Sequence, residues 1–194
     1  MKLVDLPRYG PVHRFGNHHV YRTLMALSDQ KRKGRKHIAD VVGIGEGSMR
    51  TIIEYLRGLD MIDIRQTGVK ITRHGNDFLS NLPIKMANIG HGSIALGQEC
   101  VAVQMSNNSD NIKLGVEQRD SAIMAGADGA TTLVVRGGKM IVPPDYELDE
   151  HDPAITALLR SVFNIRNGDA IIIGTAPTVA MAEDGALAAA FDLL

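Results

Sequence analysis

The sequence predicts a mixed α+β protein of two domains, residues 1–82 and 83–194, from three observations. In the first part, apolar residues at helical spacing give way to two short alternating runs, which predicts helices followed by a hairpin. In the second part, strand and helix patterns alternate. The charge is also divided: residues 1–82 carry 14 Lys and Arg against 8 Asp and Glu, a net charge of +6, whereas residues 83–194 carry 7 against 14, a net charge of −7. This asymmetry indicates two units with different partners, with the boundary at Leu82-Pro83.

Three helices are expected in the basic part, and each shows an apolar stripe at helical spacing; they cover His18 to Asp29, Arg35 to Val42 and Ser48 to Leu59. The last two are separated by Gly43-Ile44-Gly45-Glu46-Gly47, a tight turn in which glycine tolerates positive φ. Two alternating runs around Gln66-Thr67-Gly68 then predict a hairpin. A closing helix is expected from Arg73 to Leu82.

This layout, and above all the stretch "RKHIADVVGIGEGSMRTIIEYLRGLDMIDIRQTGVKITRHG" from Arg35 to Gly75, resembles the winged helix-turn-helix domain of prokaryotic and archaeal transcriptional regulators. The resemblance extends from Asn17 to Leu82. It implies a protein that regulates transcription by binding double-stranded DNA in a sequence-specific way. The third helix would enter the major groove with its N-terminal residues against the base edges.

Several polar residues of the basic part are suited to that role. Arg50 can donate a bidentate pair to guanine, and Ser48 can cap the helix or donate to a phosphate. Glu54 has two interpretations, an acceptor from cytosine or an ion pair with Arg50 or Arg57, and its spacing favours the ion pair. The expected DNA-binding residues are Lys31, Arg32, Lys33, Arg35, Lys36, Ser48, Arg50, Thr51, Arg57, Arg65 and Lys70. The alternatives are that the basic loop is merely solvated, and that the winged helix binds a protein instead of DNA.

The acidic part is expected to be ferredoxin-like, with the order βαββαβ followed by a last helix. Strands are expected at Glu99 to Ser106, Thr131 to Arg136, Lys139 to Val142 and Ala170 to Gly174, and helices at Val116 to Ala125, Asp152 to Asn164 and Thr178 to Leu193. Ala170 to Gly174 is wholly apolar, which predicts a central strand. Gly90-His91-Gly92 is expected to be a loop, and an extra strand is possible near Ser93 to Leu96. The alanine-rich last helix is expected to pack on the sheet or on a second copy of the chain, which favours a homodimer.

In outline this part resembles the ligand-sensing domains attached to helix-turn-helix proteins of the leucine-responsive and amino-acid-binding types. The run from Gly115 to Pro143 also resembles the C-terminal domain of a group of archaeal winged-helix proteins. A small-molecule effector is therefore considered, and the candidate residues are Glu117, Asp120, Arg136, Lys139, Thr175 and Thr178. The alternatives are acids that favour a helix N-terminus, an ordinary helix cap and solvated residues at a sheet edge.

Other classes of function find little support in the sequence. Cysteine and histidine lack the spacings of a zinc site, and the motifs of hydrolases, phosphate-binding loops and metalloproteases are missing, so neither a metal, nor a cofactor, nor an enzyme is expected. A small-molecule enzyme with a regulatory N-terminal domain is the remaining alternative. The expected strands lack the aromatic residues of RNA-recognition sheets. One cysteine, Cys100, and no apolar run of bilayer length favour a cytoplasmic protein without membrane contact.

Overall fold

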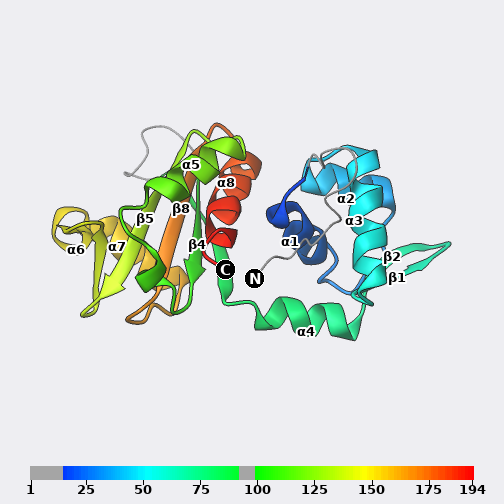
Figure 1. Ribbon diagram of the computed structural model, residues 1–194, viewed down its shortest axis with the longest axis horizontal. Helices are drawn as coiled ribbons and strands as arrows, with labels where there is room; N and C mark the ends of the chain where they lie inside the picture. The colour runs from blue at the N-terminus through cyan, green and yellow to red at the C-terminus, as the bar shows by residue number, and fades with distance from the viewer. Residues whose placement is uncertain (1–14, 92–98) are drawn as a thin grey trace. The chain divides into compact units, whose positions relative to one another are not determined.

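The computed structural model describes residues 15–91 and 99–194 and has a mixed α+β fold. The chain divides into two compact units, residues 1–82 and residues 83–194, here called unit 1 and unit 2. Figure 1 shows helices and a hairpin in unit 1 and a sheet with helices in unit 2. Within the described ranges, no helix combines the length and apolar character needed to cross a membrane.

The described part of unit 1, residues 15–82, contains three helices, a two-stranded hairpin and a fourth helix. In chain order these are α1 (Asn17–Ala26), α2 (Arg35–Val42), α3 (Glu46–Gly58), β1 (Ile62–Arg65), β2 (Gly68–Ile71) and α4 (Arg73–Asn81). The stripes that predicted the helices form one core, which includes Leu24, Ile38, Ile52 and Leu56, each at most 1% exposed. Burial of these side chains supplies most of the stability that such short helices lack on their own.

Two local features close unit 1. Thr72 is the N-cap of α4, where its hydroxyl accepts from the Gly75 N–H at 3.1 Å and donates to the Asp60 carbonyl at 2.7 Å. Gly75 has no room for a side chain, because a Cβ there would lie 2.2 Å from the Met61 carbonyl oxygen. The polypeptide entering β1 and the start of α4 are therefore in direct contact.

Unit 2 contains a six-stranded antiparallel sheet in the order β3-β4-β8-β5-β6-β7. Its elements in chain order are β3 (Ile84–His91), β4 (Glu99–Met105), the 3₁₀ turn η1 (Ser109–Asn111), α5 (Val116–Met124), β5 (Gly129–Arg136), β6 (Lys139–Val142), β7 (Tyr146–Glu147), α6 (Leu148–His151), α7 (Pro153–Val162), β8 (Ala170–Ala176) and α8 (Val179–Phe191). The sheet places the apolar strand β8 at its centre, as its composition predicts.

Helices cover both faces of this sheet. Helix α8 packs on β4 and β8, and α5 packs on β5 beside α8. On the other face, Leu148, Ile155 and Leu159 of α6 and α7 pack on Cys100, Ala102 and neighbouring strand residues. The alanines of α8 allow a close approach, since a Cβ at Gly174 of β8 would lie 2.4 Å from the Ala182 carbonyl oxygen. The small face of α8 is therefore used within unit 2.

The strand order corrects the expectation of a ferredoxin-like sheet. That plan places the last strand at an edge and both helices on one face, whereas here β8 lies between β4 and β5 and helices cover both faces. The physical reason is the sequence of β8, in which all seven residues are buried. A strand that is apolar on both sides needs neighbours along both edges and a helix layer on each face.

Several boundaries also differ from those predicted. Strand β3 runs to His91, where a loop was expected at Gly90, and its apolar residue Ile89 joins the core of unit 2. Helix α3 begins at Glu46, so its first turn includes two residues assigned to the preceding turn. The short elements β7 and α6 were not predicted. The possible strand at Ser93 to Leu96 lies outside the described residues.

Candidate nucleic-acid interface

The turn between α2 and α3 is short and fixed by the backbone. Gly43 ends α2 with φ of +80°, a left-handed conformation that glycine adopts without a steric penalty, and Gly45 is the N-cap of α3. The guanidinium of Arg22, 8% exposed, donates to the carbonyls of Val41 at 3.2 Å and Val42 at 3.0 Å. A buried cation thus satisfies the C-terminal end of α2, where the helix dipole is negative. This role of Arg22 has no signal in the sequence, because its acceptors lie about 20 residues further along the chain.

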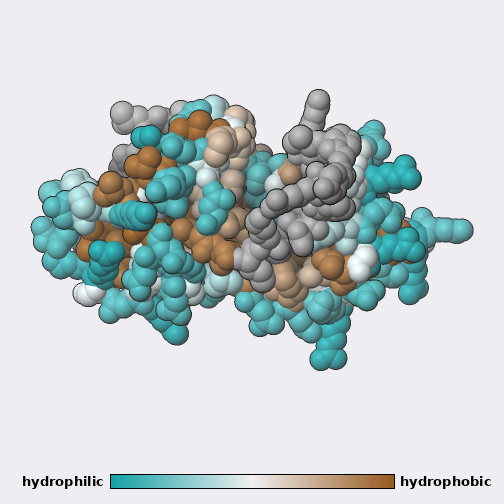
Figure 2. Space-filling view, in the orientation of Figure 1, coloured by the Kyte–Doolittle hydropathy of each residue, from teal (hydrophilic) through white to brown (hydrophobic). Residues whose placement is uncertain are grey.

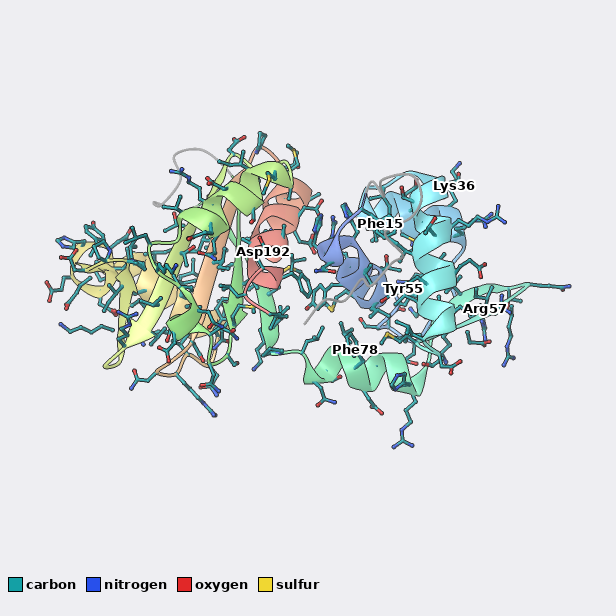
Figure 3. All side chains as sticks on the ribbon, viewed as in Figure 1. Phe15, Lys36, Tyr55, Arg57, Phe78 and Asp192 are labelled. Atoms are coloured by element: carbon teal, nitrogen blue, oxygen red, sulfur yellow. The ribbon has the colours of Figure 1, made fainter. Side chains whose placement is uncertain are left out.

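Helix α3 has one face in the core and one face in solvent. Met49, Ile52, Ile53 and Leu56 are buried, whereas Arg50, Glu54 and Arg57 are exposed. Arg57 and Glu54 form an ion pair at 3.7 Å, which agrees with the interpretation that Glu54 pairs with a neighbouring arginine. Figure 3 shows Tyr55 on the side of α3 toward α1 and Arg57 on the opposite side, near the hairpin.

The start of α3 also contains two other predicted side chains, Ser48 and Thr51. Ser48 lies inside the first turn and is not the N-cap, because the helix begins two residues earlier. The Thr51 hydroxyl donates to the Gly47 carbonyl at 3.3 Å. Arg50 is therefore the basic side chain that is exposed in the first turns of α3.

The loop between α1 and α2 is attached to the hairpin through Arg32 and Lys33. Lys33 and Val69 exchange two backbone hydrogen bonds of 2.9 Å, which adds a single bridge beside β2. The Arg32 guanidinium donates to the Gly68 carbonyl at 2.9 Å and to the Asp63 carboxylate. The Arg32 hydrogen bond is the main reason why the pKa of Asp63 lies below its usual value. Arg65 also pairs with Asp63, at 3.0 Å.

The Lys33 side chain is engaged within unit 1 as well. Its ammonium donates to the Ala26 carbonyl and lies 3.2 Å from the Asp29 carboxylate. Of the residues expected to contact DNA, Arg32, Lys33, Arg57 and Arg65 therefore have partners inside the unit. The five that make no side-chain hydrogen bond or ion pair with any described residue are here called the unpaired cations: Lys31, Arg35, Lys36, Arg50 and Lys70.

A groove of about 370 Å³ lies between the start of α2, the outer side of α3 and the hairpin. Its lining includes Arg35, Glu54 and Arg65. Of the unpaired cations, Arg35 itself lines the groove. The others lie close to its lining in the sequence: Lys36 follows Arg35, Arg50 is one helical turn before Glu54, Lys70 follows Val69, and Lys31 is two residues before Lys33, which bridges to Val69. Figure 2 shows hydrophilic residues over the hairpin at the right edge of the view.

The effector residues considered in unit 2 do not form one site. The Thr178 hydroxyl caps α8 by accepting from the Met181 N–H at 3.3 Å, and Thr175 donates to the Gly129 carbonyl at 3.4 Å. Thr178 is therefore an ordinary helix cap, which was the alternative to an effector site, and Thr175 is engaged by a neighbouring strand. Glu117 and Asp120 are exposed in the first turns of α5.

The remaining two lie at the other end of strand β5. Arg136 ends β5, seven residues from the Gly129 that pairs with Thr175, a distance of about 23 Å along an extended strand. Lys139 forms ion pairs with Glu147 and Glu150, and Glu147 is the main reason why the pKa of Lys139 is raised. These ion pairs join the start of β6 to β7 and α6.

Comparison with known proteins covers both units. A family model described as a domain of unknown function, DUF4443, matches residues 96–193, and a model described as the PH0730-like N-terminal domain matches residues 22–77. Among solved structures, the hypothetical protein PH0730 from Pyrococcus horikoshii OT3 is similar with a TM-score of 0.69 and 28% identity, over 90% of this chain and 91% of that chain. Curated proteins give no match. The archaeal source of PH0730 agrees with the archaeal resemblance seen in the sequence.

Proposed function

The chain belongs to the DUF4443 family, and for this member we propose a function in sequence-specific binding of double-stranded DNA, as a transcriptional regulator rather than an enzyme. Unit 1 is the DNA-binding unit in this proposal. It acts as a winged helix-turn-helix, with α2 and α3 as the helix pair and the β1–β2 hairpin as the wing.

The observation that carries the proposal is the set of unpaired cations on the α1–α2 loop, α2, α3 and β2, of which Arg35 lines the groove. A long side chain that is basic, exposed and without an internal partner is available to a phosphate at little cost. Neighbouring cations that already have partners, such as Lys33, would have to break an ion pair and a hydrogen bond first. The excess positive charge of residues 1–82 favours nucleic acid over an average protein surface.

The geometry of α3 supports reading of bases by Arg50. In a helix-turn-helix, the first turns of the second helix approach base edges in the major groove. Arg50 is exposed there and makes no described ion pair, whereas Glu54 and Arg57 neutralise each other one and two turns later. A bidentate contact from Arg50 to guanine would contribute about 1–3 kcal/mol of discrimination.

Binding as a homodimer to paired half-sites is part of the proposal, because two short recognition helices together specify a longer site. The dimer surface would have to be other than the small face of α8, which packs on Gly174 of the sheet and near Ala122 and Ala127. Sedimentation of the full chain tests this part, and a monomer at working concentration in the presence of its selected duplex would overturn it.

The test begins with selection of duplexes from a random pool by the full chain. Fluorescence anisotropy then compares a selected duplex with random DNA at low and moderate salt. We expect tighter binding to the selected duplex, and we expect Arg50→Ala to remove most of the difference while leaving binding to random DNA nearly unchanged. Arg119→Ala in unit 2 is the matched control, since it removes the same charge from an exposed helix position.

One outcome would reject the proposal, and another would reject the role of Arg50 within it. One is failure of selection to enrich any sequence above random DNA, together with capture of a protein partner through unit 1. The other is an equal loss of affinity for selected and random DNA in Arg50→Ala, which would remove the assignment of this residue to base reading.

A further inference from the structure

Unit 2 contains a polar pocket of about 290 Å³ at the end of the sheet where β3 begins and β4 ends. We call it the amide pocket. Its lining includes Lys85 of β3, Gln104 of β4, and side chains from the two loops that follow β4 and α7: Asn107, Asn164, Arg166 and Asp169. The volume is at the lower end of the range of small-molecule sites, about 300–1,000 Å³.

Asp169 holds these loops together. Its side chain is 3% exposed, and its carboxylate accepts from the Gln104 Nε2 at 2.6 Å, the Arg166 N–H at 2.9 Å and the Asn107 N–H at 3.2 Å. Both carboxylate oxygens are thus engaged in the wall of the pocket. The shape of the pocket is consequently fixed by a buried hydrogen-bond network.

The charges left for a ligand are positive. Lys85 and Arg166 are exposed, and their side chains make no ion pair or hydrogen bond with residues in the described ranges. The Asp169 charge is screened by three donors on the inner side. A small molecule in the pocket therefore meets two basic groups and several carboxamides.

Gln104 belongs to the wall of the pocket. Its Nε2 donates to Asp169 and to the Asn164 carbonyl at 3.0 Å, which fixes the orientation of the amide, because the reverse orientation would place two acceptors against each other. Its Oε1 is buried with no donor among the described residues and is closed to solvent, so a ligand in the pocket does not reach it. Gln104 therefore shapes the wall, and binding is left to the exposed side chains.

We infer that the amide pocket binds a small anion, that is, a carboxylate or a phosphate ester. The anionic group is held by Lys85 and Arg166. This site is separate from the six effector residues considered from the sequence. It does not depend on DNA binding by unit 1.

The experiment uses the full chain and four probes: malate and succinate as carboxylates, and glycerol 3-phosphate and inorganic phosphate as phosphates. Binding is measured by isothermal titration, with thermal shift as a second readout, since a ligand that binds the native state raises the unfolding temperature. We expect at least one of the four probes to bind at millimolar concentration or below. The preferred probe distinguishes a carboxylate ligand from a phosphate ligand.

Variants locate the site. Lys85→Gln and Arg166→Gln remove exposed charges without disturbing the Asp169 network, and each is expected to weaken binding of the preferred probe about tenfold or more. Lys113→Gln is the control, because it removes an exposed charge of unit 2 outside the pocket. Absence of binding by all four probes at millimolar concentration would overturn the inference. Binding that Lys85→Gln and Arg166→Gln leave unchanged would also overturn it.

Discussion

Replacing Lys36 by alanine is expected to reduce the salt dependence of DNA binding, whereas replacing Lys33 by methionine is not. The reason is that Lys36 is one of the unpaired cations, while the Lys33 ammonium is bound to Asp29 and to the Ala26 carbonyl. If Arg50 contacts a base, four unpaired cations remain for phosphates. Each phosphate contact contributes a slope of about −0.9 to the plot of log K against log salt.

The expected slope is therefore about −3.6 per bound protomer, which corresponds to a loss of affinity of about 150-fold between 50 and 200 mM salt. Lys36→Ala should reduce the slope to about −2.7, and Lys33→Met should leave it near −3.6. Fluorescence anisotropy with one labelled duplex over a series of salt concentrations measures all three slopes, with circular dichroism to verify that both variants fold. An equal reduction by both variants would refute the assignment of Lys33 to an internal role.

The remaining predictions concern unit 2. Gly174→Ala should lower the free energy of unfolding by about 1–3 kcal/mol, because its Cβ would lie 2.4 Å from one backbone atom of α8 and 2.8 Å from another. Gly129→Ala, with its nearest contact at 4.0 Å, should change it by less than about 0.5 kcal/mol; similar losses in both variants, measured by urea denaturation, would count against the close packing of α8. Burial acts to raise the pKa of Asp149, but hydrogen bonds from Arg160 and the Met140 N–H outweigh it and hold the pKa below its ordinary value of 3.8. Because the folded-state pKa is depressed, the stabilisation is present above about pH 4 and is lost as pH falls below it, so Asp149→Asn should flatten the acid limb of a plot of unfolding free energy against pH.

Most elements of the fold could be predicted because their apolar spacing is strong. Arg35 to Val42 and Lys139 to Val142 have the predicted bounds, since glycines or prolines mark their ends. The spatial order of the strands could not be predicted with the same rules. Alternation shows which residues share a face of a strand, but the neighbour of β8 depends on which edges remain open after the other strands pair.

The candidate sites show the same difference between local and long-range information. Exposure of Arg50 and Arg57 follows from the helical period of α3, and their neighbour Glu54 was correctly assigned to an ion pair. The internal partners of Arg32 lie more than 30 residues away, in the hairpin, so the run of basic residues alone gave no sign of them. The amide pocket was missed for the same reason, because Gln104 and Asp169 meet only in the folded chain.

The bridge between Lys33 and Val69 also has a consequence for self-association. A two-stranded hairpin has an open edge on each side, and open edges are templates for pairing with other chains. The backbone of Lys33 occupies the N–H and the carbonyl of Val69, so the middle of the outer edge of β2 is protected. A fragment of unit 1 that begins after Gly34 would expose this edge and would be prone to aggregate, even though it would retain the helix pair and the whole hairpin.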